Sequence, residues 1–142
     1  MQLDRVIAKG QLVPLTFMQD AVAASQTDVQ LPISEVNAGA GNAIAGYIAP
    51  FDGEIVAVSW ILSAAGTTGT FTVGPTVGGT EKTALTQTIG TGASGRGKVS
   101  RGSVMFSAGD EIGAEITTGG TWDGTSSDFA VTVWVLLYLD GI

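Results

Sequence analysis

The 142-residue sequence contains no cysteine and no histidine. Without cysteine, disulfide bonds and thiolate metal sites are excluded. Without histidine, the commonest general base and the commonest metal ligand are missing, and neither a Ser-His-Asp nor a Cys-His catalytic system is possible. We therefore expect a protein with no enzymatic activity, no catalytic residues, no metal site and no cofactor.

Charge is also sparse in this sequence. Only 13% of the residues are charged, and the formal net charge is −7. A chain with this charge repels phosphate backbones, so we expect no nucleic-acid partner. No apolar run reaches the roughly 18 residues of a membrane helix, and residues 1–7 lack the basic region and long apolar core of a signal peptide. We therefore expect no membrane partner.

What the sequence does contain is glycine, 21 residues in all, within a chain that is 44% hydrophobic. Turn signals such as Asp52-Gly53, Gly78-Gly79 and Gly109-Asp110 separate short strand-like segments. These segments lie at 28–34, 44–49, 54–63, 70–74, 82–89, 98–107, 110–117 and 128–139. Eight short strands at this spacing predict an all-β, antiparallel β-sandwich over residues 27–142.

Residues 1–26 differ from this body because they contain a single glycine, Gly10, and two of the three methionines. They contain two short extended pieces, 4–7 and 12–18, and Pro14 interrupts the second. One interpretation is an extended N-terminal arm that docks against something larger. The other is a first edge strand of the same domain, since proline is tolerated at sheet edges. We assign residues 1–26 to an arm and residues 27–142 to the sandwich domain.

The segment Phe129–Leu139 is apolar on both faces of the strand that it predicts. Alternate side chains point to opposite sides, and a half-solvated strand carries apolar residues on one side only. The segment Glu54–Ser63 shows the same two-sided pattern. The second face of such strands needs a cover, and in a small domain another subunit supplies it. The predicted subunit interface consists of Trp60, Trp134, Leu136 and Tyr138.

Three segments together carry a family resemblance: Ile48–Trp60 with its Pro-Phe-Asp-Gly turn, Val104–Ile112 with Phe-Ser-Ala-Gly-Asp, and the final apolar strand. This pattern, over roughly residues 44–139, resembles the β-sandwich modules of tailed-phage virion proteins. It is similar, more loosely, to the trimeric C1q/TNF-like jelly rolls. The resemblance implies a jelly roll, with the tulip-like β fold of some decoration proteins as the alternative.

The resemblance also implies a role. It indicates a homotrimer that binds the major capsid protein on the outer surface of a bacteriophage capsid and stabilises the shell, as a decoration or cement protein does. An N-terminal arm in such proteins often reaches along the shell. The apolar arm residues that we expect to contact the capsid are Leu3, Val6, Ile7, Leu12, Leu15 and Phe17. We therefore expect the protein in the virion, on the capsid exterior.

Two rival functions stay open. A receptor-binding head-fibre or tail-tip module would use the same trimeric sandwich, but it would gather aromatic residues on loops, where Trp122 stands alone. An enzyme acting on glycans would need two carboxyl groups facing each other across a cleft. The loop from Trp122 to Asp128 has two carboxylates but lacks regular calcium-loop spacing.

Two further segments are candidate sites. Gly90–Gly95 matches G-x-G-x-x-G, but no helix pattern follows, so we predict a flexible loop and no dinucleotide site. Arg96, Lys98 and Arg101 are half of the six basic residues and stand close together. Three interpretations of this cluster stay open. The cations pair with acidic residues of a neighbouring subunit, they contact a capsid surface, or they lie on a solvated loop.

Overall fold

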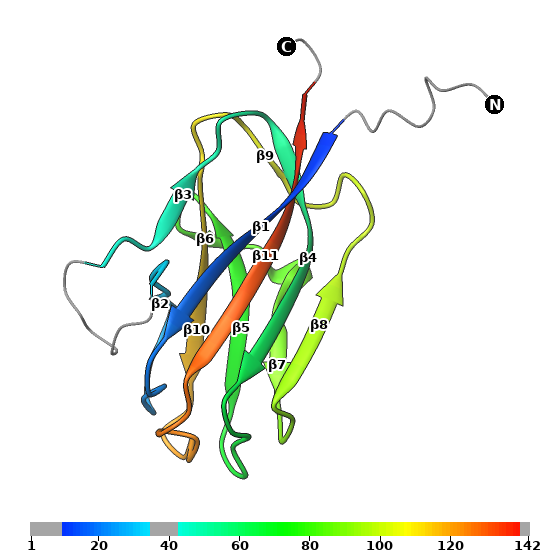
Figure 1. Ribbon diagram of the computed structural model, residues 1–142. Coiled ribbons are helices and arrows are strands. Elements are labelled where there is room, and N and C mark those ends of the chain that lie inside the picture. The colour runs from blue at the N-terminus through cyan, green and yellow to red at the C-terminus, as the bar shows by residue number, and fades with distance from the viewer. Residues whose placement is uncertain (1–9, 35–42, 140–142) are drawn as a thin grey trace.

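The computed structural model describes residues 10–34 and 43–139, and these residues form two antiparallel sheets packed face to face (Figure 1). This is the β-sandwich that the sequence predicted, while the choice between a jelly roll and a tulip-like fold stays a prediction. Within the described ranges there is one short 3-10 helix, η2 (Thr83–Leu85). No helix in these ranges is long and apolar enough to cross a membrane.

The front sheet, nearer the viewer in Figure 1, has the strand order β1-β11-β4-β8, with β9 also paired to β4. Its strands are β1 (Gly10–Gln19), β11 (Phe129–Tyr138), β4 (Gly53–Leu62), β8 (Ser94–Lys98) and β9 (Met105–Phe106). The strands β1 and β11 pair along ten residues, from Gly10 opposite Tyr138 to Gln19 opposite Phe129.

The back sheet has the order β2-β10-β5-β6, with β3 paired to β10 and β7 paired to β5. Its strands are β10 (Glu111–Thr118), β5 (Phe71–Val77), β2 (Val29–Gln30), β3 (Gly46–Ile48), β6 (Thr80–Glu81) and β7 (Gln87–Ile89). Two predicted strands are subdivided. Residues 82–89 form η2 and β7, and residues 98–107 form the end of β8, a turn and β9.

Aromatic side chains fill the space between the sheets. The rings of Phe71 and Phe129 lie 4.9 Å apart between centroids, and Trp122 packs edge-on against Phe71 at 5.1 Å. Strand alternation explains the pattern, because Phe129, Val131, Val133 and Val135 point inward and are buried while their neighbours point outward. The predicted two-sided alternation of the final strand is therefore confirmed.

A β-bulge in β4 alters the faces that the sequence predicted for this strand. Trp134 pairs with Ala57 and Val135 pairs with Ile55, so Val56 is the extra residue. Simple alternation places Val56 with Val58 and Ile55 on the opposite side. Because of the bulge, Ile55 is fully buried and Val56 is only partly buried.

The structure corrects the predicted arm of residues 1–26. Residues 10–19 are the strand β1, and Phe17 on this strand is fully buried in the core. After β1 the chain stays attached to the body, since the amide of Val22 donates to the carbonyl of Ser127 at 3.0 Å. The edge-strand interpretation is therefore confirmed for residues 10–19, and the domain begins before residue 27. Residues 1–9 lie outside the described ranges.

Candidate functional site

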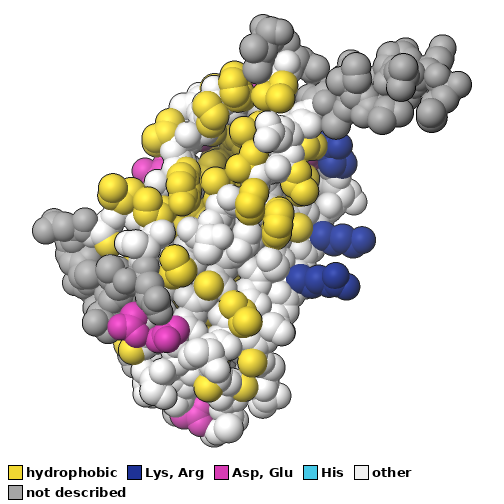
Figure 2. Space-filling model, in the orientation of Figure 1, with side chains coloured by type: hydrophobic (Ala, Val, Ile, Leu, Met, Phe, Trp, Pro, Cys, Tyr) yellow, Lys and Arg dark blue, Asp and Glu magenta, His cyan; other side chains and the backbone are white. Residues whose placement is uncertain are grey.

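The outer face of the front sheet carries apolar side chains that the chain itself does not cover. Leu12 is 54% exposed, Ile61 58% and Met105 50%. Trp134, Leu136 and Tyr138 of β11 point to the same face and are partly exposed. Leu136 lies in one row with Leu12 and Met105, whereas Ile61 lies further along the sheet, beyond the row of Thr132 and Ser59. Figure 2 shows this face, with hydrophobic side chains over its upper and central part and Lys and Arg side chains along the edge where β8 lies.

The predicted interface residues Trp134, Leu136 and Tyr138 therefore share one surface, but Trp60 does not join them. Trp60 points between the sheets, is 7% exposed and packs 6.5 Å from the ring of Phe129. Its assignment to an exposed subunit interface is corrected, because both sides of the β4 pattern are apolar and the sequence did not reveal which side faces the core.

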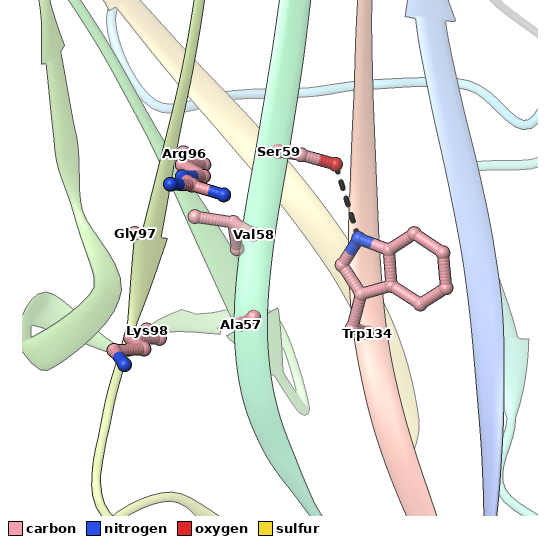
Figure 3. A pocket seen from close by; sticks show the side chains of 7 residues that line it. All are labelled: Ala57, Val58, Ser59, Arg96, Gly97, Lys98 and Trp134. Atoms are coloured by element: carbon pink, nitrogen blue, oxygen red, sulfur yellow. Dashed lines mark hydrogen bonds between the residues drawn. The ribbon is translucent and has the colours of Figure 1, made fainter.

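A shallow hollow of about 470 Å³ lies in this face, spanning the neighbouring strands β8, β4 and β11 (Figure 3). The indole N–H of Trp134 donates to the hydroxyl of Ser59 at 3.0 Å, which fixes the orientation of the ring. Small side chains of β4 lie beside the ring, and two cations stand across from it on β8. The residues that line the hollow are Ala57, Val58, Ser59, Arg96, Gly97, Lys98 and Trp134.

The cations reach this face because glycine occupies the alternate positions of β8. Gly95 opposes Trp60, and a Cβ atom on Gly95 would lie 2.5 Å from the Trp60 ring. Arg96 opposes Ser59 and Lys98 opposes Ala57, so both point outward with the Trp134 face. The end of the predicted flexible glycine-rich loop, from Ser94 onward, is thus an ordered strand. Its glycines permit close packing on the core.

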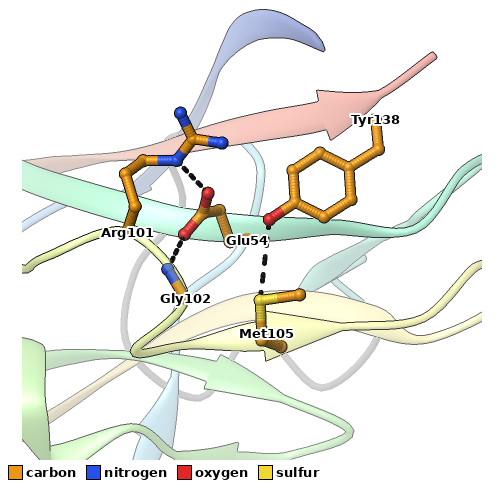
Figure 4. Close-up of polar contacts among 5 residues, drawn as sticks. All are labelled: Glu54, Arg101, Gly102, Met105 and Tyr138. Atoms are coloured by element: carbon orange, nitrogen blue, oxygen red, sulfur yellow. Dashed lines mark hydrogen bonds and ion pairs between the residues drawn. The ribbon is translucent and has the colours of Figure 1, made fainter. Parts of the chain in front are cut away.

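At the upper end of the same face, a buried carboxylate holds the turn that follows β8. Glu54 is 1% exposed and accepts hydrogen bonds from the Arg101 side chain and the Gly102 amide (Figure 4). Nearby, the hydroxyl of Tyr138 contacts the sulfur of Met105 at 3.6 Å. Burial raises the pKa of Glu54, but the bonds from Gly102 and Arg101 outweigh burial, and the pKa lies below its ordinary value.

The outer face of the back sheet has a different character. Glu115 is 8% exposed and accepts a hydrogen bond from Gln30 at 2.6 Å. Thr76 also donates to Gln30, at 3.2 Å, and Glu81 accepts from the Thr86 hydroxyl. Burial and the nearby charges of Glu81 and Asp28 raise the pKa of Glu115. Most side chains of this face are polar, as expected of a sheet face in contact with water, although Ile48 of β3, opposite Glu111, is 64% exposed.

The remaining predicted arm residues separate into three groups. Leu12 lies on the exposed outer face of the front sheet, whereas Leu15 points inward beside the fully buried Phe17. Leu15 also lines a small apolar crevice of about 180 Å³ between the sheets. Leu3, Val6 and Ile7 fall outside the described residues.

Trp122, the one aromatic residue predicted on a loop, is 3% exposed and donates its indole N–H to the carbonyl of Val22 at 3.2 Å. The adjacent Asp123 ties two loops together by accepting from the amide of Thr67 at 2.8 Å and that of Thr68 at 3.1 Å. Hydrogen bonds from the Thr67 hydroxyl and these two amides lower the pKa of Asp123 to about 2.

A pair of carboxylates, Asp20 and Asp128, lies where β1 ends and β11 begins. A side-chain hydrogen bond with Asp128, together with burial and the Asp128 charge, raises the pKa of Asp20. The amide of Ala21 donates to Asp128 at 3.3 Å. Among the described residues, no group of three His, Cys, Asp or Glu side chains is arranged to hold a metal ion.

Comparisons with protein-family models and with curated proteins found no match to this chain.

Proposed function

We propose that this chain is a structural virion protein that binds the outer surface of a phage capsid as a homotrimer and stabilises the shell. The observation that carries the proposal is the uncovered apolar part of the front sheet, where Leu12 and Met105 are each at least half exposed and lie in one row with Leu136. Soluble monomers rarely expose large contiguous apolar patches, and such patches mark interaction sites. The resemblance of residues 44–139 to phage virion modules gives this surface its biological setting.

A trimer places this face against other copies of the same chain. Trp134, Leu136 and Tyr138 supply aromatic and aliphatic area of the kind that dominates stable interfaces. Within the proposal, the fold is a jelly roll, and capsid attachment falls to residues 1–9, because residues 10–19 are committed to β1. The role is structural and not catalytic, in keeping with a sequence that has no histidine and no cysteine.

The receptor-binding alternative depended on Trp122 as an exposed loop aromatic. That side chain is buried against Phe71 and bonded to the backbone of Val22. It therefore gives no support to a recognition tip, and the decoration role is the one that we propose.

The proposal is tested in two steps. Light scattering on the purified protein should give the mass of three copies, and a monomer at micromolar concentration would overturn the trimer. Phage particles assembled with and without the protein should then differ in capsid-surface density and in resistance to heat. Particles whose exterior is unchanged by its absence would overturn the capsid role.

Truncation separates attachment from folding. Deleting residues 1–9 should leave a folded trimer that no longer stays on particles, because the described sandwich begins at Gly10. Deleting residues 1–26 should prevent folding, because it removes β1 and the fully buried Phe17. A 1–9 deletion that still binds particles would place the capsid contact on the body of the protein.

A further inference from the structure

We propose that the cations Arg96 and Lys98 form a socket for a second copy of this chain, whose carboxylates Asp20 and Asp128 enter the hollow beside Trp134. The contact is head-to-tail: each copy presents the socket toward one edge of its front sheet and the carboxylates toward the other. This inference rests on the proposed self-assembly and names the residues that fix its geometry.

A surface that covers the hollow meets cations as well as the Trp134 ring. Arg96, Lys98 and Trp134 line one hollow, so a partner that covers the Trp134 ring also covers both cations. The one salt bridge within residues 10–34 and 43–139 joins Arg101 to Glu54, so neither Arg96 nor Lys98 forms one there. Burying unpaired cations is costly, whereas burying them with carboxylates is tolerated. The covering surface must therefore bring negative charge.

Repulsion between like charges excludes a symmetric contact centred on the hollow. The carboxylate carried by the strands of this face is that of Glu54, which is buried and already bonded to Arg101 and Gly102. Stacking the hollow on its own copy would place cations against cations. A heterologous contact avoids this repulsion, and heterologous contacts that close generate rings such as trimers.

We assign the negative charge to the carboxylates of Asp20 and Asp128. Asp20 follows the last residue of the edge strand β1, and Asp128 precedes the first residue of β11, the next strand of the front sheet. The opposite edge strand, β8, is three strand spacings from β1 and two from β11, roughly 14 and 10 Å. The two charged groups of one copy therefore lie toward opposite edges of the sheet. They are placed to meet their counterparts on neighbouring copies.

Three other carboxylates already have neutral partners. Glu115 accepts from Gln30, Glu81 from Thr86, and Asp123 from Thr67 and Thr68. Asp128 also accepts from the amide of Ala21, but it shares a hydrogen bond with Asp20, and the charges of the two carboxylates repel. A cation brought between two such carboxylates relieves that repulsion. Two cations meeting two carboxylates also leaves the contact neutral in a chain whose net charge of −7 otherwise opposes association.

Zero-length carbodiimide cross-linking of the wild-type protein tests the contact directly. Copies labelled with ¹⁴N and ¹⁵N are mixed, allowed to exchange and cross-linked. Mass spectrometry should then find Lys98 joined to Asp20 or Asp128 in peptides of mixed isotope. Intermolecular cross-links from Lys98 to other carboxylates only, or none in a protein that is trimeric, would overturn the inference while leaving the trimer in place.

Charge reversal supplies the second test. R96E/K98E and D20K/D128K should each raise the dissociation constant of the oligomer by at least about tenfold at low salt, and the combined four-residue variant should recover assembly. Lys82→Glu carries the same type of charge change on the turn after β6 and should leave assembly unaffected. Circular dichroism confirms the fold of each variant.

The outcomes separate the inference from the proposed function. If R96E/K98E assembles as the wild type does, the socket is wrong although the trimer stands. If R96E/K98E stays trimeric but leaves phage particles, the cations face the capsid, and the inference is likewise overturned. If the wild-type protein is itself a monomer, the proposed trimer fails and the inference fails with it.

Discussion

The two outer faces of the sandwich are built on equally regular antiparallel sheets but carry opposite chemistry. On the back sheet, Glu115 lies in a row with Gln30 and Gly74. On the front sheet, Trp134 lies in a row with Pro14 and Ala57. Apart from Ile48, the back face follows the alternation of apolar inside and polar outside, whereas the front face carries outward apolar residues on β1, β4, β9 and β11. Both sheets are antiparallel, so the difference between their outward side chains reflects what each face contacts.

The charges divide in the same way. On the back face, burial and then the nearby charges of Glu81 and Asp28 raise the pKa of Glu115. The front face holds Arg96 and Lys98, and its buried Glu54 is paired with Arg101. On the back face, the carboxylate of Glu115 is held by a neutral partner, Gln30. The front face combines cations with exposed apolar area, a composition found at interfaces in which aromatic residues and arginine are enriched.

The largest expected effect comes from placing a charge on each face in turn. Leu136→Asp should raise the dissociation constant of the oligomer more than about hundredfold, because it buries an unpaired carboxylate in the proposed interface. Thr88→Asp makes the same kind of change on the back sheet, at an exposed position of β7, and should leave the mass unchanged. Sedimentation velocity measures the mass of both variants. If the two variants have the same mass, the front face is no more an interface than the back face.

A medium effect is expected at the buried carboxylate of the front sheet. Glu54→Gln should lower the free energy of unfolding by about 1–3 kcal/mol at neutral pH, because it weakens the bonds to Arg101 and Gly102. The pKa of Glu54 is depressed in the folded state, so its contribution is present above the ordinary value of 4.5 and is lost as the pH falls through the folded value.

Urea denaturation from pH 7 down to pH 3 measures this effect. The wild type should lose its advantage over the Glu54→Gln variant in acid. A constant difference across the pH range would show that the carboxylate charge is not what holds the turn after β8.

The smallest effect is expected on the back face, with the opposite sign. Glu115→Gln should stabilise the protein at neutral pH by on the order of 0.5 kcal/mol, because it removes a partly buried charge near Glu81 and Asp28. A raised pKa means that the carboxylate penalises the folded state above that pKa. The gain should therefore vanish as the pH falls to about 4.5 and below. Thermal unfolding at pH 7 and pH 4 tests this, and destabilisation at pH 7 would show that the bond to Gln30 matters more.

The β-sandwich and the two-sided final strand were predictable because alternation in Phe129–Leu139 is regular and uninterrupted. The orientation of Trp60 was not, since β4 is apolar on both sides and the bulge at Val56 shifts its register. A bulge depends on pairing with a distant strand and leaves little trace in the local pattern. For the same reason, Pro14 did not distinguish an arm from an edge strand, because the partner of β1 lies more than a hundred residues away.

The sequence shows Arg96 and Lys98 as a charge cluster, but it does not show that they lie on an ordered strand beside Trp134. Gly95 and Gly97 read as a flexible loop in sequence, whereas in the structure a side chain at Gly95 would overlap Trp60. Glycine at alternate positions of a strand indicates close packing only when the side chain that packs against it, here Trp60, is known. Asp20 and Asp128 are 108 residues apart in the chain, so their proximity also depends on the β1–β11 pairing.

The pairing of β1 with β11 has a consequence for how the protein is made. The hydroxyls of Thr16 and Thr132 bond across a separation of 116 residues, and the whole of β1 depends on the same distant partner. During synthesis, β1 leaves the ribosome long before β11 exists, so the front sheet closes only after β11 has emerged. Such non-local pairing slows folding. The interval before closure, when the apolar residues of β1 have no partner strand, is therefore the stage most exposed to aggregation in the cell.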